Sequence, residues 1–370
     1  MKSGYDIHSL MDKIKNNQEV AVDLRLNTKD LEFTVAETIT ADDEKVNHPL
    51  LCLSNNVTEE VLLPTGDSLM LNRTCQQQLA NKLEMPIKYW DKCLKEEPQL
   101  LSRNVNTWMW NHPSDNLFRT LDGTGRAFLS NRYEIIDHFE VLQTIMPTFS
   151  RFDELNYHDS YITDDRMYMR VTIPEFTKTI NSKRNDIVEL GLMVSNSETG
   201  MGSVRIEPLV VRLSCTNGLV VKDRAISRKH IGKRWDSELD TRVLKQETIV
   251  QNERAWLMTT RDQVDALFNG PVFEEITATI IEGASSEPVE RPSKAVEVIK
   301  KEHKFSDLEG EQILEALMKN QDYTKWGMTN AVTEASAKSE SADRAVEMEA
   351  VGWEILSSHA NQWNSIRTAA

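Results

Sequence analysis

The segment from Gly191 to Asp236 constrains the fold of this chain more than any other. An apolar run leads into the polar turn sequence SNSETGMG at 195–202, and a second apolar run continues from 204 to 215. Two β-rich runs joined by a glycine-containing turn predict an antiparallel hairpin. Asn217-Gly218 then predicts a second reversal, because Asn and Gly adopt positive φ at little cost. We therefore expect a largely antiparallel sheet at the centre of the protein.

Two further hairpins are predicted earlier in the chain. The stretch 116–132 has an Asp-Gly pair between two strand-like runs, which is a strong turn signal. The stretch 157–172 has two adjacent aspartates at its middle, and its second half alternates apolar and polar residues. Shorter strands are expected at 20–24 and 31–35.

Apolar residues at intervals of three and four predict helices around these strands. The expected helical ranges are 7–14, a helix pair within 74–94, 97–108, 135–146, 239–268, 272–282, 295–302, 306–319, 324–338 and 342–357. Ser306 and Ser341 stand where helix N-caps are needed. The predicted fold class is α+β: a mixed, mostly antiparallel sheet with packed helices, followed by a helical C-terminal region.

The polar sequence GASSEPVERPSK is the clearest boundary signal, because it is rich in Pro, Ser and Glu. Four regions are predicted on this basis. They are an N-terminal helix with short strands at 1–72, an α+β core with two hairpin motifs and a basic arm at 73–283, a linker at 284–294 and an acidic helical subdomain at 295–370. The last region contains three tryptophans, so we expect it to pack into a small core instead of staying disordered.

Composition narrows the class of protein. The 370 residues include 39% hydrophobic and 27% charged residues, and no apolar run is long enough for a membrane span. The N-terminus lacks the apolar segment of a secretory signal, and the four cysteines form neither a disulfide framework nor a metal motif. A cytoplasmic location in a bacterial host cell is therefore expected, with no membrane partner.

The net charge of −15 argues against coating duplex DNA, but the charge is unevenly distributed. Residues 302–358 hold twelve Asp or Glu against five Lys or Arg, whereas 222–234 is densely basic. Arginines also recur in the predicted hairpins, where they are suited to contact a phosphate backbone. The predicted nucleic-acid-binding residues are Arg119, Arg126, Arg132, Arg166, Arg170, Lys222, Arg224, Arg228, Lys229, His230, Lys233 and Arg234.

The sequence contains no clear catalytic or metal-binding motif. His158-Asp159 with Asp164-Asp165 is the one place where His and carboxylates crowd, but the second pair stands where a hairpin needs turn residues. The SNSETGMG turn lacks the GK[ST] that follows in a phosphate-binding loop. No catalytic residue, metal ligand or cofactor is therefore predicted, and an enzyme is the minority interpretation.

Two features near residue 100 have both a DNA-binding and a structural interpretation. The helix pair at 74–94 is similar to a helix-turn-helix, but its second helix offers few cations, which favours ordinary packing. The cluster Trp108-Met109-Trp110 is able to stack on bases, yet large aromatic residues at a helix end are more often part of a core. We therefore expect both features to be structural.

Four motifs resemble those of a phage- and plasmid-encoded family catalogued as domain of unknown function nine hundred thirty-two. They are GRAFLSNRYEIID at Gly125–Asp137, GLMVSNSETGMGSVRIEPLVVRLSCTNGLV at Gly191–Val220, SRKHIG at Ser227–Gly232 and WGMTNAVTE at Trp326–Glu334. The second motif is specific and the others support it. The resemblance implies a phage, prophage or plasmid context, and it transfers no catalytic residue.

These observations lead to one expected function and two alternatives. We expect a mobile-element protein that binds single-stranded DNA along the predicted arginines, with an accessory role in strand annealing, recombination or replication. One alternative is a non-enzymatic regulator or inhibitor of a host system that binds a protein partner through its acidic helices. A metal-dependent nuclease is the other. The oligomeric state stays open, a homo-oligomer included.

Overall fold

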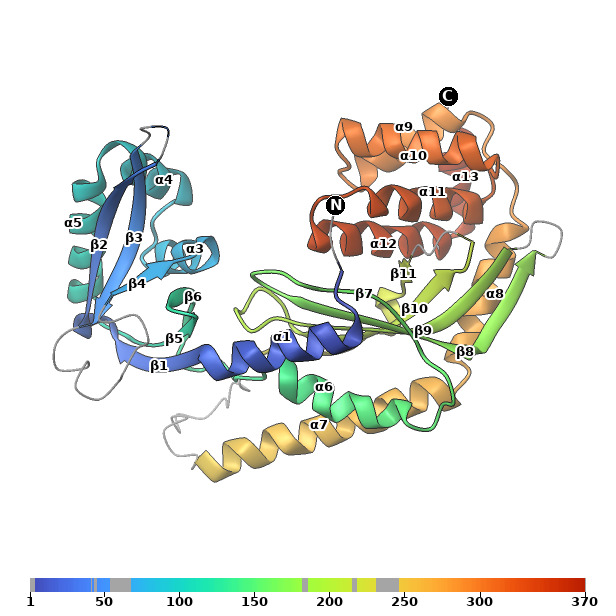
Figure 1. Ribbon diagram of the computed structural model, residues 1–370. Helices are drawn as coiled ribbons and strands as arrows, with labels where there is room; N and C mark the ends of the chain where they lie inside the picture. The colour runs from blue at the N-terminus through green and yellow to red at the C-terminus, as the bar shows by residue number, and fades with distance from the viewer. Residues whose placement is uncertain are drawn as a thin grey trace.

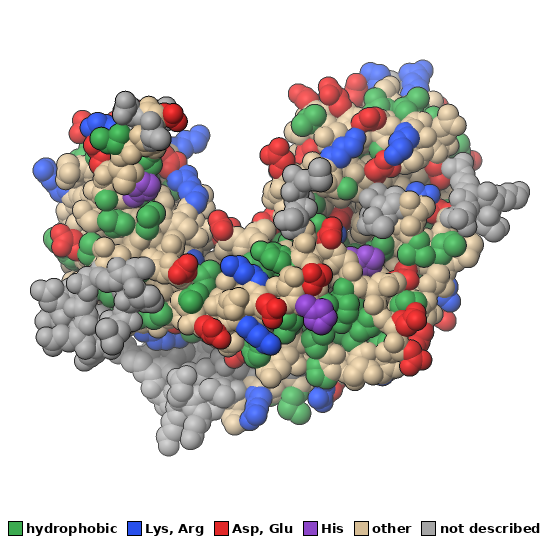
Figure 2. Space-filling view, viewed as in Figure 1, with side chains coloured by type: hydrophobic (Ala, Val, Ile, Leu, Met, Phe, Trp, Pro, Cys, Tyr) green, Lys and Arg blue, Asp and Glu red, His purple; other side chains and the backbone are tan. Residues whose placement is uncertain are grey.

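The computed structural model describes residues 4–40, 42, 45–53, 68–181, 186–214, 218–230 and 246–369. It contains two six-stranded sheets and a helical C-terminal region, so the fold is α+β as predicted. Figure 1 shows an N-terminal lobe on the left, separated from the C-terminal helices, and the second sheet lies below those helices. In the space-filling view a wide notch separates the two masses (Figure 2).

The N-terminal sheet has the strand order β1-β5-β6-β4-β3-β2, and β4 pairs with β6 in parallel while the other pairs are antiparallel. Its strands are β1 (Ala21–Asn27), β2 (Leu31–Ile39), β3 (Lys45–Leu53), β4 (Ser68–Leu71), β5 (Asp115–Leu121) and β6 (Thr124–Ser130), with a short 3-10 turn, η1 (Thr28–Asp30). The first four strands share this sheet with β5 and β6. The predicted boundary after residue 72 therefore falls inside one continuous sheet.

Three helices cover this sheet and give the lobe its own core. They are α3 (Arg73–Lys82), α4 (Ile87–Glu96) and α5 (Pro98–Asn111). Their apolar faces meet strand residues in a cluster that includes Phe33, Leu51, Leu79, Trp90 and Val105, each at most 1% exposed. Burying side chains of this size contributes about 1.5–3 kcal/mol each.

The second sheet is antiparallel, in the order β11-β10-β9-β8-β7, and β12 also pairs with β10. Its strands are β7 (Asn156–Ile162), β8 (Met167–Asn181), β9 (Asp186–Asn196), β10 (Val204–Arg212), β11 (Gly218–Val220) and β12 (Ile226–Arg228), and the 3-10 turn η3 spans Lys222–Arg224. The hairpin predicted from the SNSETGMG turn is confirmed as β9 and β10. Gly200 has a φ of +76° in that turn, a conformation that favours glycine.

Helices cover both faces of the second sheet (Figure 1). Those packed in the larger core are α1 (Ile7–Val20), α6 (His138–Phe149), α7 (Gln246–Asn269) and α8 (Val272–Ala284). The opposite face packs against α12 (Ala342–Leu356), where Val346 and Ala350 meet Tyr168, Met193 and Leu209. Because both faces of this sheet are covered, the sequences of β9 and β10 are nearly continuous apolar runs.

The C-terminal region is a set of packed helices, as expected. In addition to α12 it contains α9 (Pro292–Glu302), α10 (Asp307–Asn320), α11 (Lys325–Ala337) and α13 (Ala360–Arg367). Their core includes Phe305, Ile313, Leu317 and Trp363, all at most 6% exposed. Within the described ranges, none of the helices has the length and apolar character needed to cross a membrane.

Candidate nucleic-acid interface

Arg119 of β5 and Arg126 of β6 are buried, with 1% and 8% of their surface exposed. The Nε and Nη2 atoms of Arg119 donate to both carboxylate oxygens of Asp23 at 2.8 and 2.9 Å, and Nη2 also donates to Asp137 at 2.7 Å. Its Nη1 donates to the backbone oxygen of Glu198 at 3.0 Å, while Arg126 donates to the Glu198 carboxylate at 2.6 Å. These two arginines therefore join the N-terminal lobe to the β9–β10 turn.

The charges of this ion-pair network stabilise one another. Burial alone would lower the pKa of Arg119, but Asp137 and Asp23 outweigh burial and raise it, so the guanidinium stays charged. Burial alone would raise the pKa of Glu198, but the guanidinium groups of Arg126 and Arg119 and the backbone N–H of His138, which donates to the carboxylate at 2.7 Å, hold it below its ordinary value. Both arginines are therefore tied to internal carboxylates.

Arg166 directly precedes β8 and Arg170 lies near its start, next to the acidic helix α12. Arg170 donates from both terminal nitrogens to the two carboxylate oxygens of Glu349, at 2.9 and 2.8 Å, in a bidentate pair. The hydroxyl of Tyr168 donates to Asp343 at 2.5 Å, and Arg166 donates to the backbone oxygen of Met201. The face of the second sheet that carries Arg170 is thus covered by α12.

The basic segment after β11 is also partly paired. Arg224 lies 2.8 Å from Glu275, and Arg228 lies 2.5 Å from Glu134 and 4.9 Å from the centre of the Trp256 ring. Lys222 is half-buried, and Lys229 is exposed.

His230 is 3% exposed and was predicted to contact a phosphate. Its ring stacks on Tyr133 with centroids 5.1 Å apart, and Nε2 lies 2.9 Å from Oδ1 of Asn196. Burial lowers the pKa of His230 to about 4, so the ring is neutral at pH 7. A neutral, buried imidazole is a poor phosphate contact.

The predicted nucleic-acid-binding residues do not form one exposed set. Arg119, Arg126 and Arg170 are enclosed in ion pairs, and His230 is inside the fold. On the face seen in Figure 2, basic and acidic side chains are interspersed instead of forming a positive band. Arg132 is exposed, and Lys233 and Arg234 lie outside the described residues.

The structure instead exposes aromatic residues on α4 and α5. Trp108 is 45% exposed and Tyr89 is 41% exposed. The Trp108 ring stacks on His112, with centroids 5.8 Å apart and an interplanar angle of 13°. Asn104, one helical turn before Trp108, donates to the Tyr89 hydroxyl at 3.1 Å and so connects the two helices. A row of polar and aromatic side chains therefore crosses from α4 to α5.

Cations border this row. Lys88, Lys92 and Lys95 recur along one side of α4 and are exposed, and none of them forms an ion pair with another described residue. Arg103 is exposed on α5. We define the α4–α5 surface by these cations and the aromatic row: Lys88, Tyr89, Lys92, Lys95, Arg103, Asn104, Trp108 and His112.

Sequence reasoning interpreted the Trp108-Met109-Trp110 cluster as core, which is wrong for both tryptophans. Only Met109 is buried, and Trp110 is 51% exposed with its Nε1 donating to Leu31 of β2 at 3.1 Å. The signal was present in the sequence. Leu101, Val105 and Met109 recur every four residues and define the buried face of α5, which leaves their neighbours outside it.

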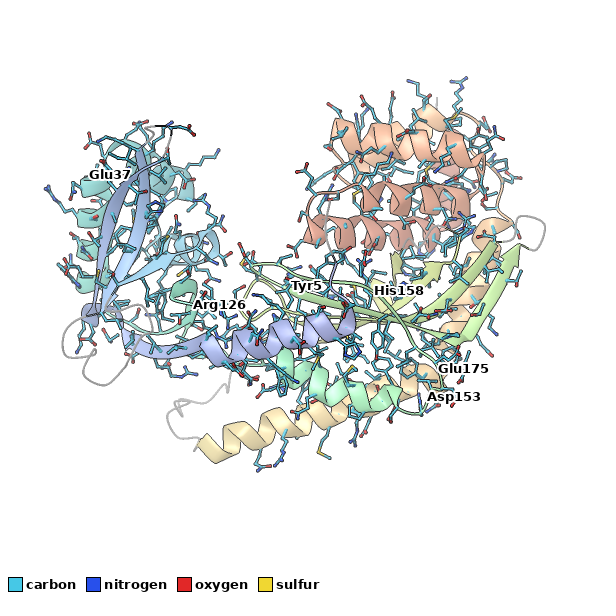
Figure 3. All side chains as sticks on the ribbon, in the orientation of Figure 1. Tyr5, Glu37, Arg126, Asp153, His158 and Glu175 are labelled. Carbon is cyan, nitrogen blue, oxygen red and sulfur yellow. The ribbon has the colours of Figure 1, made fainter. Side chains whose placement is uncertain are left out.

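In the described part of the chain, no group of three His, Cys, Asp or Glu side chains is placed to hold a metal ion. His158, labelled in Figure 3, lies instead within hydrogen-bonding distance of Thr172, with Nε2 2.7 Å from its hydroxyl oxygen.

Residues 127–351 match the sequence model of a family described as Domain of unknown function (DUF932). The chain belongs to this family. No curated protein and no solved structure matches the chain. The matched range of DUF932 contains β7 to β12 and helices α6 to α11, whereas the α4–α5 surface precedes it.

Proposed function

We propose that this DUF932 protein binds single-stranded DNA through the α4–α5 surface. The observation that carries the proposal is the stack of the half-exposed Trp108 ring on His112, on a helix that packs against α4, whose exposed lysines form no ion pair with another described residue. Single-strand binding proteins combine aromatic rings, on which unpaired bases stack, with cations that follow the phosphate backbone. The α4–α5 surface offers both kinds of group within two adjacent helices.

The strand, rather than the duplex, is the better match to this surface. Bases in a duplex are already stacked on each other, whereas an unpaired base offers a free face to an indole ring. The whole chain carries a net charge of −15 and repels a polyanion, so binding rests on a local set of cations. Contact with four cations predicts a slope of log K against log salt of about −3 for single-stranded DNA.

The predicted arginines then have an indirect role. Arg119 and Arg126 join the N-terminal lobe to the β9–β10 turn, and Arg170 anchors α12, so they hold the fold together instead of contacting the strand. A protein of this kind fits strand handling during replication or recombination of a phage or other mobile element in the bacterial cytoplasm. This context comes from the family resemblance of the four sequence motifs.

The test is fluorescence anisotropy with a labelled oligothymidine and with its duplex, over a range of salt concentrations. Trp108→Ala removes the stacking ring, and we expect about 5- to 100-fold weaker single-strand binding. Leu100→Ala is the matched control, since Leu100 is 39% exposed on the same helix and offers no ring. Equal affinity of both variants, or tighter binding of the duplex, would contradict the proposal.

The lysines are tested by a charge-matched pair of double variants. Lys88→Gln with Lys92→Gln is expected to weaken binding and to reduce the steepness of the salt dependence by about 1.4, at about 0.7 for each lost contact. Lys13→Gln with Lys15→Gln removes the same charge from exposed positions of α1 and is expected to leave the slope unchanged. Equal slopes in the two double variants would show that the α4 lysines do not contact the strand.

A further inference from the structure

A cavity of about 250 Å³ lies where α1 and the N-terminal sheet meet the second sheet. Residues of α1, β1, β5, β6, α6 and the β9–β10 turn line it, and Arg126, labelled in Figure 3, lies near the C-terminal end of α1. The volume corresponds to about eight water molecules at about 30 Å³ each. That is room for a fused ring system with a small substituent and not for a large cofactor.

The charges around the cavity restrict the ligand. Arg119 and Arg126 oppose the carboxylates of Asp23, Asp137 and Glu198, and ion pairs join these groups to one another. An anion entering the cavity meets three carboxylates, and a cation meets two guanidinium groups. A neutral molecule with hydrogen-bonding edges avoids both repulsions and uses the lone pairs and N–H groups that remain.

One buried donor without a hydrogen-bond partner remains for such a molecule, and His138 adds a second N–H group to the lining. The Nε atom of Arg126 has no hydrogen-bond partner, although the side chain is more than nine-tenths buried. The amide nitrogen of Asn196 donates to the backbone oxygen of Ile136 at 2.9 Å and lies 3.1 Å from Nδ1 of His138. Nδ1 therefore accepts, and the ring proton of His138 is on Nε2. Burial lowers the pKa of His138, which keeps this ring neutral.

The remaining walls suit a flat ring with a polar edge. Phe139 and Ile14 supply apolar surface, and Asn17 and Gln18 of α1 supply amide groups that donate and accept. The carboxylates of Asp23 and Asp137 are about one-quarter exposed and accept N–H groups. The lining thus contains acceptors, donors and an aromatic ring.

We propose that this cavity binds a free purine base or nucleoside, with guanine as the best match. Guanine has two adjacent N–H donors for a carboxylate and two acceptors, O6 and N7, for arginine or imidazole N–H groups. Its ring packs against Phe139. The proposal does not depend on DNA binding, because the α4–α5 surface shares no residue with the cavity.

The experiment uses the full chain and isothermal titration calorimetry with guanosine, adenosine, cytidine and uridine. Glutamate, as a zwitterion, and inorganic phosphate serve as the charged probes. We expect guanosine to bind at least tenfold more tightly than the pyrimidine nucleosides and the charged probes. Tighter binding of glutamate or phosphate, or no heat with any nucleoside, would overturn the proposal.

Pairs of matched variants test whether guanosine binds in this cavity. Asn17→Ala removes an amide from the lining and is expected to weaken guanosine binding about tenfold, whereas Asn16→Ala changes its exposed neighbour and leaves affinity unchanged. Phe139→Leu keeps apolar bulk and removes the flat ring, with a similar expected loss. Equal affinity of the Asn16 and Asn17 variants would refute this placement. Trp108→Ala must leave guanosine affinity unchanged, so failure of DNA binding and failure of this site are distinguishable.

Discussion

The buried ring of His230 makes the stability of the protein depend on pH in a defined window. We compare the wild type with the variant His230→Gln, which lacks the titrating ring, as the pH is lowered from 7 to 4. Burial lowers the pKa of His230 from 6.5 to about 4. This difference corresponds to about 3 kcal/mol in the free energy of unfolding, at about 1.4 kcal/mol for each pH unit.

The direction follows from which state binds the proton. Above pH 6.5 the imidazole is neutral in the folded and in the unfolded chain, so the contribution of His230 is complete. Between pH 6.5 and about 4 the unfolded chain binds a proton that the folded chain excludes, so stability falls as the pH falls. Below about pH 4 both states are protonated, and His230 causes no further loss.

The assay is urea unfolding followed by tryptophan fluorescence at several pH values from 7 to 4. Other groups titrate in this range, so the informative quantity is the difference between the wild type and His230→Gln. We expect the stability of the wild type to fall more steeply than that of the variant, by up to about 3 kcal/mol over the window. His359→Gln, at an exposed position, serves as the control. Parallel curves for the wild type and His230→Gln would refute the reasoning.

Two further predictions concern the junction between the lobes. Gly200→Ala places a methyl carbon 2.6 Å from Cδ2 of Leu129, at a residue whose φ is +76°. We expect the substitution to destabilise the protein by about 1–2 kcal/mol in a thermal melt. An unchanged melting temperature would show that the turn relaxes freely. Arg119→Met leaves Asp23 and Asp137 without their shared cation. We expect the free energy of unfolding, measured by chemical denaturation, to fall by about 3–5 kcal/mol. A decrease below about 1 kcal/mol would mean that the ion pairs contribute little.

Much of the fold could be predicted because its signals are local. Turn residues marked the β5–β6, β7–β8 and β9–β10 hairpins, and apolar periodicity marked the C-terminal helices. Ser306 and Ser341 cap α10 and α12 as expected, with side chains that accept from Glu309 and Arg344 backbone N–H groups. Helix α13 and strands β3, β4, β11 and β12 were not specified as separate elements, since each is short or lacks a clear local pattern.

The burial of the predicted arginines was harder to foresee, because their partners are distant in sequence. Asp23 precedes Arg119 by 96 residues, and Glu349 follows Arg170 by 179. Nothing near either arginine shows that a carboxylate will reach it. A cluster of cations in an acidic chain was therefore interpreted as surface, whereas tertiary packing paired several of its members.

The SNSETGMG turn shows what the family motif contributes to this protein. The backbone oxygens of Ser197, Glu198 and Thr199 accept hydrogen bonds from Tyr133, Arg119 and Gln78, at 3.0, 3.0 and 2.7 Å. Two of these donors, Arg119 and Gln78, belong to the N-terminal lobe, so the turn is a joint between the lobe and the second sheet. The matched range contains this turn, whereas the α4–α5 surface lies before it. The family match therefore covers the second sheet and the turn that joins it to the lobe. The proposed strand-binding surface lies outside the match, so it rests only on the exposed rings and lysines of this chain.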